Sequence, residues 1–489
     1  MLPYLSLIPL DRQASAPLSA QIVAAIIRAV KGGVLSPGAK LPGSRTMAAL
    51  LGVHRKTVIT AYDELMAQGW LEGHPSRGTF VSRQLPDVKP RPLDGIHPGQ
   101  LPTQTGFSIH TRPHLAFPVI KAEPMLTLDD GFPDGRLAPL DALARSYRRV
   151  LQRGFQHRLL SYADTNGSLF FRQQLARYLH DSRGIAATPD HLFTTRGSVM
   201  GIYLVSRLLL QPGDGVVIGD LSYRSATMIF DECGARLLTV PVDGQGIRVD
   251  ALEELCRKQP VRMVYVTPHH HYPTTVTLSA ERRIRLLQLA EEYRFAILED
   301  DYDYDFHYAS SPILPLASAD ASGMVIYIGS FTKTIAPAFR VGYVVAPPNL
   351  IAELGYLRRI IDRQGDAILE QALAELLAEG DVQRHLKKAQ RIYHQRRDTF
   401  SSLLREHLGE AVTFDVPDGG MAVWTRFDEA IDLPQLAERC RKNGLSFNNG
   451  QFYHSGQDRW HHTRLGFASK TVEELEQAVG VLGVTINAV

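Results

Sequence analysis

A lysine stands where a buried strand would end. Residues 324–328 form an apolar run that leads through small and polar residues to Lys333. A buried lysine amine loses its charge readily, which is the property that a Schiff-base lysine needs. Ser330, Thr332 and Arg340 flank it with the donors that a phosphate requires. We therefore predict a Schiff-base lysine beside a phosphate site; the alternative is a strand-end lysine whose amine reaches solvent.

A second apolar strand leads into a group of carboxylates. Residues 295–298 run directly into the three acids at 299–301, and Tyr302 follows. Neighbouring acids repel one another unless a cation lies among them. A protonated pyridine nitrogen is such a cation, and an aspartate opposite it, here Asp300, keeps a pyridoxal ring in its electron-accepting form. Tyr302 could then reach the phenolic oxygen of that ring. A metal site and a solvated acidic loop are the alternatives, and Lys333 downstream favours the pyridoxal interpretation.

Together these motifs resemble those of the fold-type I aminotransferases. The matching residues are Asp300, Tyr302, Ser330, Thr332, Lys333, Arg340 and the run Arg464-Leu465-Gly466-Phe467. The acid-rich stretch at 299–303 resembles the MocR branch of the GntR transcription regulators, and the resemblance extends from about residue 17 to residue 483. It implies pyridoxal 5'-phosphate (PLP) as the cofactor, with Lys333 as its Schiff-base partner and Asp300 opposite its ring nitrogen.

The phosphate site has a second predicted element. Residues 194–200 join a short strand to a helix, and the backbone N–H groups at such a helix start can bind a phosphate. Gly197, Ser198 and Val199 are the residues placed to provide them. Fold-type I enzymes use this element for the same purpose, which strengthens the prediction.

Three more site residues are implied by the resemblance. Tyr223 matches the aromatic residue that stacks on the pyridine ring in MocR proteins; otherwise it is an ordinary, partly buried tyrosine. Tyr162 resembles the tyrosine that reaches a phosphate across a dimer interface. Arg464 resembles the arginine that binds a substrate carboxylate, a task that suits its bidentate geometry.

One segment departs from the aminotransferases, which tend to carry Asn-Pro-x-Gly between the preceding strand and the aspartate strand. Tyr272 stands at the asparagine position and Thr275 at the glycine position. MocR regulators also show a tyrosine there, so the change favours sensing over turnover. The three histidines at 269–271 could indicate zinc, but neighbouring side chains on an extended chain point to opposite faces. We therefore predict no metal site.

The N-terminal part predicts a DNA-binding module from its residues alone. Residues 17–31 have apolar positions at helical spacing, and two glycines follow. A short helix through Leu51 should begin with Ser44 as its N-cap, and a tight turn leads to a helix over 55–68. The predicted inner face of that helix is Val58, Ala61, Tyr62, Leu65 and Met66. These helices form a helix-turn-helix whose second helix enters the major groove, and residues 71–81 form a wing.

Positive charge is concentrated in this part. Residues 1–83 hold nine Lys and Arg against four Asp and Glu, a balance of +5, whereas the whole chain carries +2 and the remainder is therefore about −3. The basic residues stand at the recognition helix and on the wing, as in GntR-type winged helices. By that resemblance the DNA contacts are Arg45, His54, Arg55, Lys56, Thr57, Arg77 and Gly78. Which of them contact phosphates and which contact base edges stays open.

Three domains are predicted. Residues 1–82 form the winged helix-turn-helix domain, and residues 83–124, with eight prolines and little periodicity, form a linker. Residues 125–489 form an aminotransferase-like, PLP-binding effector domain. Apolar strands alternate there with amphipathic helices, which predicts an α/β fold with a mainly parallel, helix-covered sheet and a small C-terminal lobe.

Composition points to a cytoplasmic protein. Three scattered cysteines fit a reducing compartment and no disulfide or metal framework. The first ten residues are apolar but lack a basic leader and run into charged residues, so we expect neither a signal peptide nor contact with a membrane.

The predicted function is a PLP-dependent transcription regulator. It would sense an amino compound or PLP through its aminotransferase-like part and bind a double-stranded DNA operator as a homodimer. The alternative is an active aminotransferase with an accessory DNA-binding module. The DNA module, the linker and the lost asparagine favour the regulator, with at most Schiff-base formation or half-transamination at its site. Steady turnover with a keto-acid acceptor would decide between the two.

Overall fold

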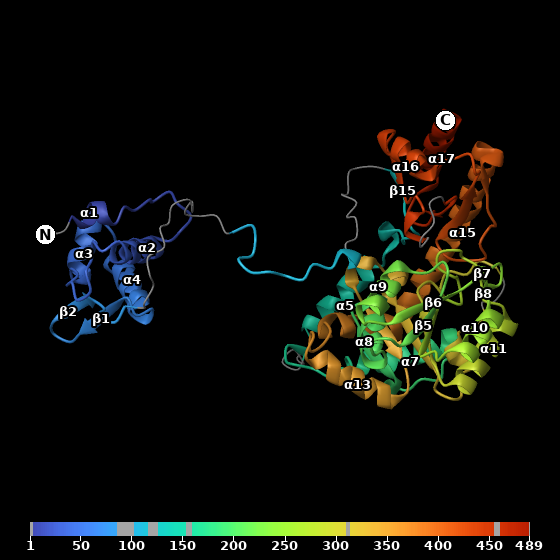
Figure 1. Cartoon of the computed structure of the whole chain (residues 1–489), viewed down its shortest axis with the longest axis horizontal. Coiled ribbons are helices and arrows are strands. Elements are labelled where there is room, and N and C mark those ends of the chain that lie inside the picture. The colour runs from blue at the N-terminus through green and yellow to red at the C-terminus, as the bar shows by residue number, and fades with distance from the viewer. Residues whose placement is uncertain are drawn as a thin grey trace. The chain divides into compact units, whose positions relative to one another are not determined.

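The computed structural model describes residues 3–85, 102–115, 126–152, 159–309, 313–453 and 460–488. The chain divides into two compact units, Met1–Thr111 and Arg112–Val489, and each is described by itself (Figure 1). Most of the predicted linker at 83–124 falls outside the described residues, so its boundaries stay a prediction.

The N-terminal unit combines helices with a small hairpin. Its elements are α1 (Tyr4–Leu7), α2 (Leu18–Lys31), α3 (Ser44–Leu51), α4 (Arg55–Ala67), β1 (Leu71–His74) and β2 (Gly78–Val81). Ile22 and Ile26 of α2 and Val58 and Leu65 of α4 are fully buried in one core. Gly52 ends α3 with φ +64°, and this left-handed conformation lets the chain turn into α4. The predicted winged helix-turn-helix is confirmed.

Two details predicted for these helices are wrong. Ser44 is the first residue of α3 and not its N-cap, because Gly43 occupies the cap position and no side chain caps the helix. The Ser44 hydroxyl instead accepts a 3.4 Å hydrogen bond from Arg55 Nε. Met66 is 36% exposed because it lies at the edge of the inner face, where its sulfur sits against Gly73 of the hairpin.

The second unit is built on a seven-stranded sheet. In spatial order the strands are β4 (Leu192–Thr195), β12 (Gly342–Val345), β11 (Val325–Ser330), β10 (Ala296–Asp301), β9 (Met263–Val266), β5 (Gly215–Gly219) and β6 (Arg236–Val240). β12 is antiparallel to both of its neighbours, and all the other pairs are parallel. The predicted mainly parallel sheet is confirmed.

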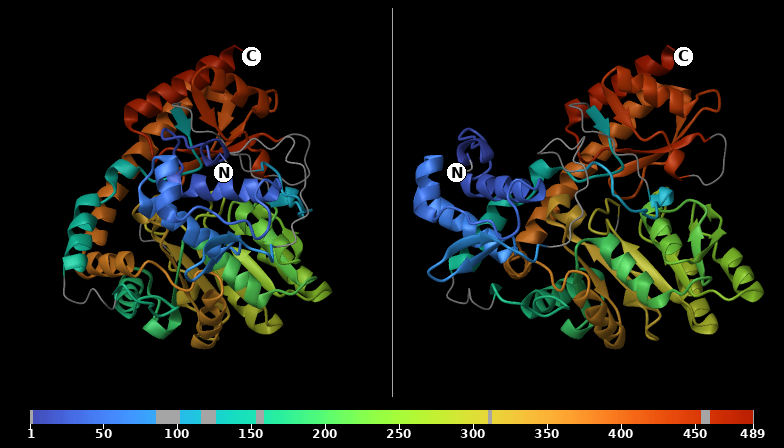
Figure 2. Two further views of the ribbon diagram at one scale, coloured as in Figure 1. Left: turned by 90° about the vertical axis from the view of Figure 1, so that its left-hand side faces the viewer. Right: turned by 60° about the vertical axis from the view of Figure 1, so that its left-hand side comes forward.

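Helices cover both faces of this sheet (Figure 2). On one face pack α8 (Ser198–Leu209), α9 (Arg224–Glu232) and α13 (Pro348–Arg359). On the other pack α5 (Leu140–Gln152), α7 (Leu169–Arg183), α10 (Val249–Lys258), α11 (Ala280–Tyr293) and α14 (Ala367–Ala378). Within β11, Ile326 and Ile328 pack in the core under α8, α9 and α13, whereas Tyr327 packs in the core on the opposite face, under α5, α7 and α14. Burial on both faces explains why the strands read as continuous apolar runs.

A long helix leads into the C-terminal lobe. α15 (Asp381–Leu408) places Val382 in the core beside the sheet and Phe400 in the core of the lobe. The lobe contains the antiparallel sheet β13 (Val412–Thr413), β14 (Ala422–Phe427) and β16 (His462–Gly466), the helices α16 (Leu433–Lys442) and α17 (Val472–Asn487), and the parallel pair β15 (Leu445–Phe447) and β3 (Leu126–Leu128). In Figure 2 the lobe, orange to red, lies beside the green and yellow sheet region. Across the described residues, no helix has the length and apolarity needed to span a membrane.

Candidate functional site

The predicted phosphate-binding residues meet at one corner of the large sheet. The ladder pairs Ser330 of β11 with Gly342 of β12, and Gly342 with Thr195 of β4. α8 begins shortly after Thr195, and α12 (Phe331–Thr334) begins directly after Ser330. The Ser330 hydroxyl caps α12 by accepting a 3.0 Å hydrogen bond from the Thr332 N–H. Strand register therefore brings two helix starts together from segments that are distant in sequence.

Gly197 and Arg340 pack against each other at this corner. Gly197 is the N-cap of α8 with φ +82°, and a Cβ added there would lie 2.6 Å from Arg340 Nη2. Arg340 Nη2 donates a 3.0 Å hydrogen bond to Arg196 O, although the residue remains exposed. The N–H groups of Ser198 and Val199 lie in the first turn of α8, where they have no helical acceptor. A helix N-terminus beside a guanidinium is an arrangement that binds anions.

Lys333 lies in α12 and is half-buried, with its amine against the turn at residues 131–132. Nζ donates a 2.7 Å hydrogen bond to Gly131 O and lies 4.3 Å from the centre of the Phe132 ring. Burial lowers the pKa of Lys333 to about 8, against the opposing effect of the Asp130 carboxylate. An amine with this pKa is substantially neutral in mildly alkaline solution and can act as a nucleophile.

Of the three acids of β10, Glu299 has both carboxylate oxygens hydrogen-bonded, whereas Asp301, like Asp300, has a buried oxygen without a partner. Glu299 accepts hydrogen bonds of 2.8 and 2.9 Å from two backbone N–H groups. Asp301 accepts a 2.6 Å hydrogen bond from the Tyr327 hydroxyl. Glu299 therefore needs no cation, and a cation beside the other two acids stays a prediction. Alternate residues of a strand face opposite sides, and Glu299 and Asp301 meet their own donors there.

Asp300 retains an oxygen without a partner. Its Oδ2 accepts a 2.8 Å hydrogen bond from the Tyr265 hydroxyl, whereas its buried Oδ1 has none. Burial raises the pKa of Asp300 to about 7, although the hydrogen bond from Tyr265 opposes the shift. A cation at Oδ1 would restore the charged carboxylate. Tyr265 was not predicted; its position on β9, the parallel neighbour of β10, was the available signal.

Tyr272, at the position of the missing asparagine, belongs to a tyrosine–carboxylate cluster. Its hydroxyl donates to Asp130 Oδ2, and Tyr453 donates to Oδ1 of the same carboxylate at 2.8 Å. The ring of Tyr223 stands nearly perpendicular to that of Tyr272, with ring centres 5.1 Å apart. Asp130 was not predicted, because no local motif marks it.

Arg464 is buried, and several groups already contact it. It is 1% exposed and donates to Asp130 O (3.2 Å), Pro273 O (3.1 Å) and the Tyr302 hydroxyl (3.3 Å). Its Nε also lies 3.5 Å from Asp130 Oδ1. Tyr302 in turn donates a 3.0 Å hydrogen bond to His270 O. The predicted carboxylate-binding arginine therefore has an internal carboxylate as its neighbour.

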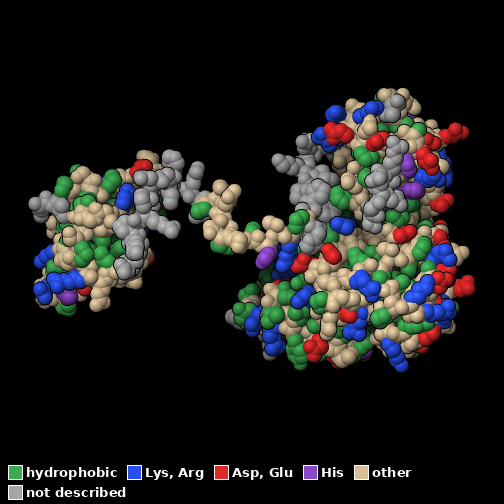
Figure 3. All heavy atoms as spheres, viewed as in Figure 1, with side chains coloured by type: hydrophobic (Ala, Val, Ile, Leu, Met, Phe, Trp, Pro, Cys, Tyr) green, Lys and Arg blue, Asp and Glu red, His purple; other side chains and the backbone are tan. Residues whose placement is uncertain are grey.

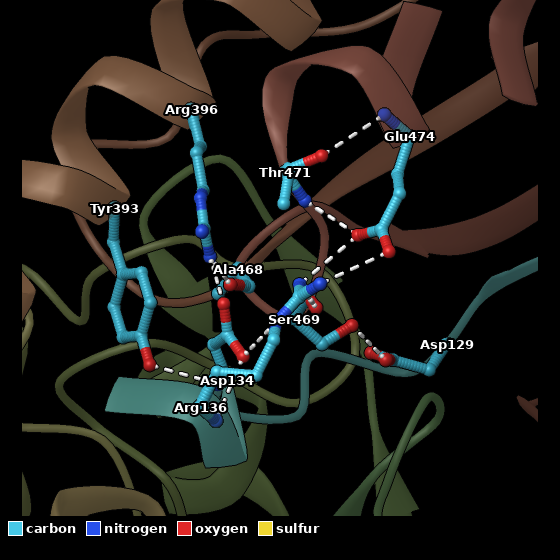
Figure 4. Close-up of polar contacts among 9 residues, drawn as sticks. All are labelled: Asp129, Asp134, Arg136, Tyr393, Arg396, Ala468, Ser469, Thr471 and Glu474. Atoms are coloured by element: carbon cyan, nitrogen blue, oxygen red, sulfur yellow. Dashed lines mark hydrogen bonds and ion pairs between the residues drawn. The ribbon is translucent and has the colours of Figure 1, made fainter. Parts of the chain in front are cut away.

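A polar network anchors the turn that contacts Lys333 (Figure 4). Asp129 accepts hydrogen bonds from the backbone N–H groups of Gly131 (2.9 Å) and Phe132 (2.8 Å). It also accepts one from the Ser469 hydroxyl. Further along, Asp134 forms a 2.9 Å ion pair with Arg396 of α15. These contacts tie the turn to the C-terminal lobe. A shift of the lobe would therefore move the turn and change its contact with Lys333.

Tyr162 lies on the surface. It is 77% exposed, and the guanidinium carbon of Arg363 lies 3.9 Å from the centre of its ring. Its predicted role across a dimer interface stays a prediction.

The predicted DNA contacts lie on the surface of the N-terminal unit. Arg45, His54, Arg55, Lys56, Arg77 and Gly78 are exposed, and Thr57 is half-buried. His54 is the N-cap of α4 and accepts a 3.2 Å hydrogen bond from the Lys56 N–H. In Figure 3, Lys and Arg side chains gather where the β1–β2 hairpin lies. A helix start and a basic wing on the surface are suited to contact a phosphate backbone.

The three consecutive histidines do not alternate as predicted. The rings of His269 and His270 are near one another, with centres 4.7 Å apart. Both residues lie in a bend after β9 and not in a strand. The alternation of an extended chain therefore gives no argument against metal binding at this place.

Comparison with known proteins connects the two units. Residues 123–482 match the family model of class I and II aminotransferases, and residues 18–81 match that of the bacterial regulatory proteins of the gntR family. The chain is 31% identical to the probable rhizopine catabolism regulatory protein MocR of Rhizobium meliloti, over 91% of this chain and 89% of that protein. It is 30% identical to the HTH-type transcriptional regulator TauR of Rhodobacter capsulatus, over 91% of each. The multiple substrate aminotransferase from Thermococcus profundus has a similar structure, with a TM-score of 0.70 and 29% identity over 76% of this chain and 93% of that one.

A GntR-type helix-turn-helix joined to a fold-type I aminotransferase fold defines the class of protein. The chain belongs to the MocR family of transcription regulators. The predicted family, fold class and regulatory function are confirmed, and the alternative of an aminotransferase with an accessory module is not favoured.

The aminotransferase family implies PLP, and the residues of the site fit this cofactor. The partnerless Asp300 Oδ1 suits a protonated pyridine nitrogen. The guanidinium of Arg340, packed against Gly197 at the start of α8, suits a phosphate. The half-buried amine of Lys333 suits an aldehyde.

Proposed function

We propose that this regulator holds PLP on Lys333 and uses the site to sense an amino compound, or PLP itself, and so to change its binding to DNA. The half-buried amine of Lys333, which donates to Gly131 O and has its pKa lowered to about 8, carries the proposal. When bound, PLP supplies an electrophilic carbon that amines attack and a ring that accepts electrons. Lys333 would provide the attacking amine and release its proton to solvent or to the nearby Asp130.

The remaining pocket residues would fix the position of the cofactor. The phosphate would be bound by Gly197, Ser198, Val199, Ser330, Thr332 and Arg340. Asp300 would keep a proton on the ring nitrogen, and the 2.8 Å hydrogen bond from Tyr265 would hold that carboxylate in place. Tyr223 would cover the ring, and Tyr302 would lie near its phenolic oxygen.

Arg464 would bind the carboxylate of an amino-acid effector. Its Nε lies 3.5 Å from Asp130 Oδ1, so an effector carboxylate must share Arg464 with Asp130 or displace it. Asp130 belongs to the turn whose Gly131 O accepts the hydrogen bond from Lys333. Effector binding at Arg464 would therefore move the same turn that contacts the cofactor lysine, and the turn is tied to the C-terminal lobe.

The N-terminal unit would bind the operator through α4 and the wing. The proposed contacts are Arg45, His54, Arg55, Lys56, Thr57, Arg77 and Gly78. We further propose that the protein works as a cytoplasmic homodimer, because two helix-turn-helix units need paired half-sites. The 77% exposed Tyr162 is available to reach a phosphate held by the partner subunit. A ligand changes DNA binding only by its different affinity for two arrangements of that dimer.

Borohydride reduction of the PLP-loaded protein, followed by peptide mapping, tests the proposal. Reduction should make the attachment permanent and place it on Lys333. Lys387→Ala, which removes an unrelated lysine of α15, should leave the labelled peptide unchanged. Label on another lysine, or no label, would contradict the assignment of the site.

A further inference from the structure

A second group of titratable side chains lies outside the proposed cofactor contacts. His269 and His270 follow β9, and His307 follows the turn after β10. One ring nitrogen from each lies within 4.8 Å of the others. His269 and His270 are 4% and 1% exposed, and His307 is half-buried. In the described part of the chain, this is the one group of three such side chains that close together.

Four of the six ring nitrogens of the group have no hydrogen-bond partner. Neither nitrogen of His269 has one, and the same holds for Nε2 of His270 and Nδ1 of His307. Buried polar atoms are costly when unpaired, so native proteins give them a protein partner, an ordered water or an ion.

A carboxylate orients the central ring. His270 Nδ1 lies 2.8 Å from Asp303 Oδ1, and both side chains are almost fully buried. With Nδ1 occupied in this way, Nε2 is the nitrogen of His270 that remains without a partner. A carboxylate bound to the far nitrogen of a metal-binding histidine is a recurring arrangement that fixes the ring and strengthens the ligand.

We propose that His269, His270 and His307 bind one zinc ion, with water as the fourth ligand. Three histidines and an open position suit Zn²⁺, whose Zn–N bonds of about 2.0–2.1 Å place tetrahedral ligand atoms roughly 3.3 Å apart. The observed separation of up to 4.8 Å is therefore larger than the bound geometry requires. Rotation of the imidazole rings toward a common centre would close the difference.

The position of the group gives the ion a structural consequence. His307 forms a β-bridge with Gly419, and Gly420 N donates a 2.7 Å hydrogen bond to Phe306 O. Gly419 and Gly420 lead into β14 of the C-terminal lobe. On the other side, His270 O accepts the 3.0 Å hydrogen bond from Tyr302, which contacts Arg464. A zinc ion here would join the loop at residues 269–270 to the loop at residue 307. Both loops lie near Arg464, and the second one contacts the C-terminal lobe.

Metal counting and competition binding test the proposal on the full-length, PLP-loaded protein without a polyhistidine tag. The protein is first stripped with a chelator and then titrated with zinc chloride against a chromophoric competitor. We expect one zinc per chain and loss of this binding in His307→Gln, which removes the least buried ligand. Asp303→Asn should keep the stoichiometry and weaken affinity by roughly 10–100-fold. The matched control, His180→Gln on the surface of α7, should bind zinc as the wild type does.

If His307→Gln does not fold, the visible spectrum of the chelator-stripped wild-type protein after addition of cobalt tests the proposal in its place. Cobalt chloride should give the intense visible bands of a tetrahedral site in the wild type, and Asp303→Asn should shift them. Less than one zinc per chain, equal zinc affinity in a folded His307→Gln variant, or a weak octahedral cobalt spectrum would overturn the proposal. The imidazoles would then be partnered by buried water.

Discussion

Gly197→Ala would damage the proposed phosphate site through one added carbon. Gly197 has φ +82° and ψ 171°, a conformation that is essentially restricted to glycine and costs another residue on the order of 1–3 kcal/mol. The new Cβ would lie 2.6 Å from Arg340 Nη2 and 2.9 Å from its Cζ, so the guanidinium must move. Loss of one charge-assisted hydrogen bond to the phosphate costs about 1.5–3 kcal/mol. The dissociation constant for PLP should therefore rise roughly 10–150-fold.

Equilibrium titration with PLP, followed by the visible absorbance of the bound cofactor, measures this effect. Denaturant unfolding without PLP measures the backbone strain separately. Gly480→Ala is the matched control, because Gly480 lies in the middle of α17 with open space around it. Alanine there should stabilise the helix by about 0.5–1 kcal/mol and leave PLP binding unchanged. PLP binding by Gly197→Ala as tight as that of the wild type would refute the reasoning about the phosphate site.

Three other predictions follow from the site and the N-terminal unit. Because the pKa of Lys333 is lowered to about 8, attachment of PLP should become faster as pH rises through 8 and then level off; stopped-flow rates that fall over this range would contradict the shift. Arg55→Ala or Arg77→Ala should weaken operator binding and leave the PLP absorbance unchanged. Where a phosphate contact is lost, the slope of the logarithm of the binding constant against the logarithm of the salt concentration should fall in magnitude by about one. Lys442→Ala on α16 is the control, and unaltered DNA binding by the arginine variants would show that these residues do not contact the operator. Because Tyr272 replaces the asparagine of the enzymes, transamination with a keto-acid acceptor should stay below about one turnover per second, and faster sustained turnover would contradict a purely sensory site.

The main sheet was predictable because its strands are buried on both faces. Such strands form continuous apolar runs, and Asp300 and Lys333 each stand just after such a run. Lys333 and Asp300 were identifiable for this reason. Register was not predictable, although it is register that places Ser330 beside Gly342 and Thr195.

The site residues that could not be predicted contact partners that are distant in the sequence. Asp130 follows a short strand that pairs with β15 near the end of the chain, and no spacing rule connects it with Arg464. The histidines illustrate the opposite error. A rule for extended chains was applied to His269 and His270, but the backbone bends there and brings the rings together.

Operator binding by the wild type and by Lys333→Ala tests most directly whether the response to ligand runs through Lys333. Both proteins would be titrated with operator DNA in the presence of PLP, with and without each standard amino acid and simple diamine. We predict that the variant keeps measurable basal affinity for the operator and loses the change that an amino compound causes in the wild type. A full response by Lys333→Ala would contradict the account, because the signal would then bypass the lysine.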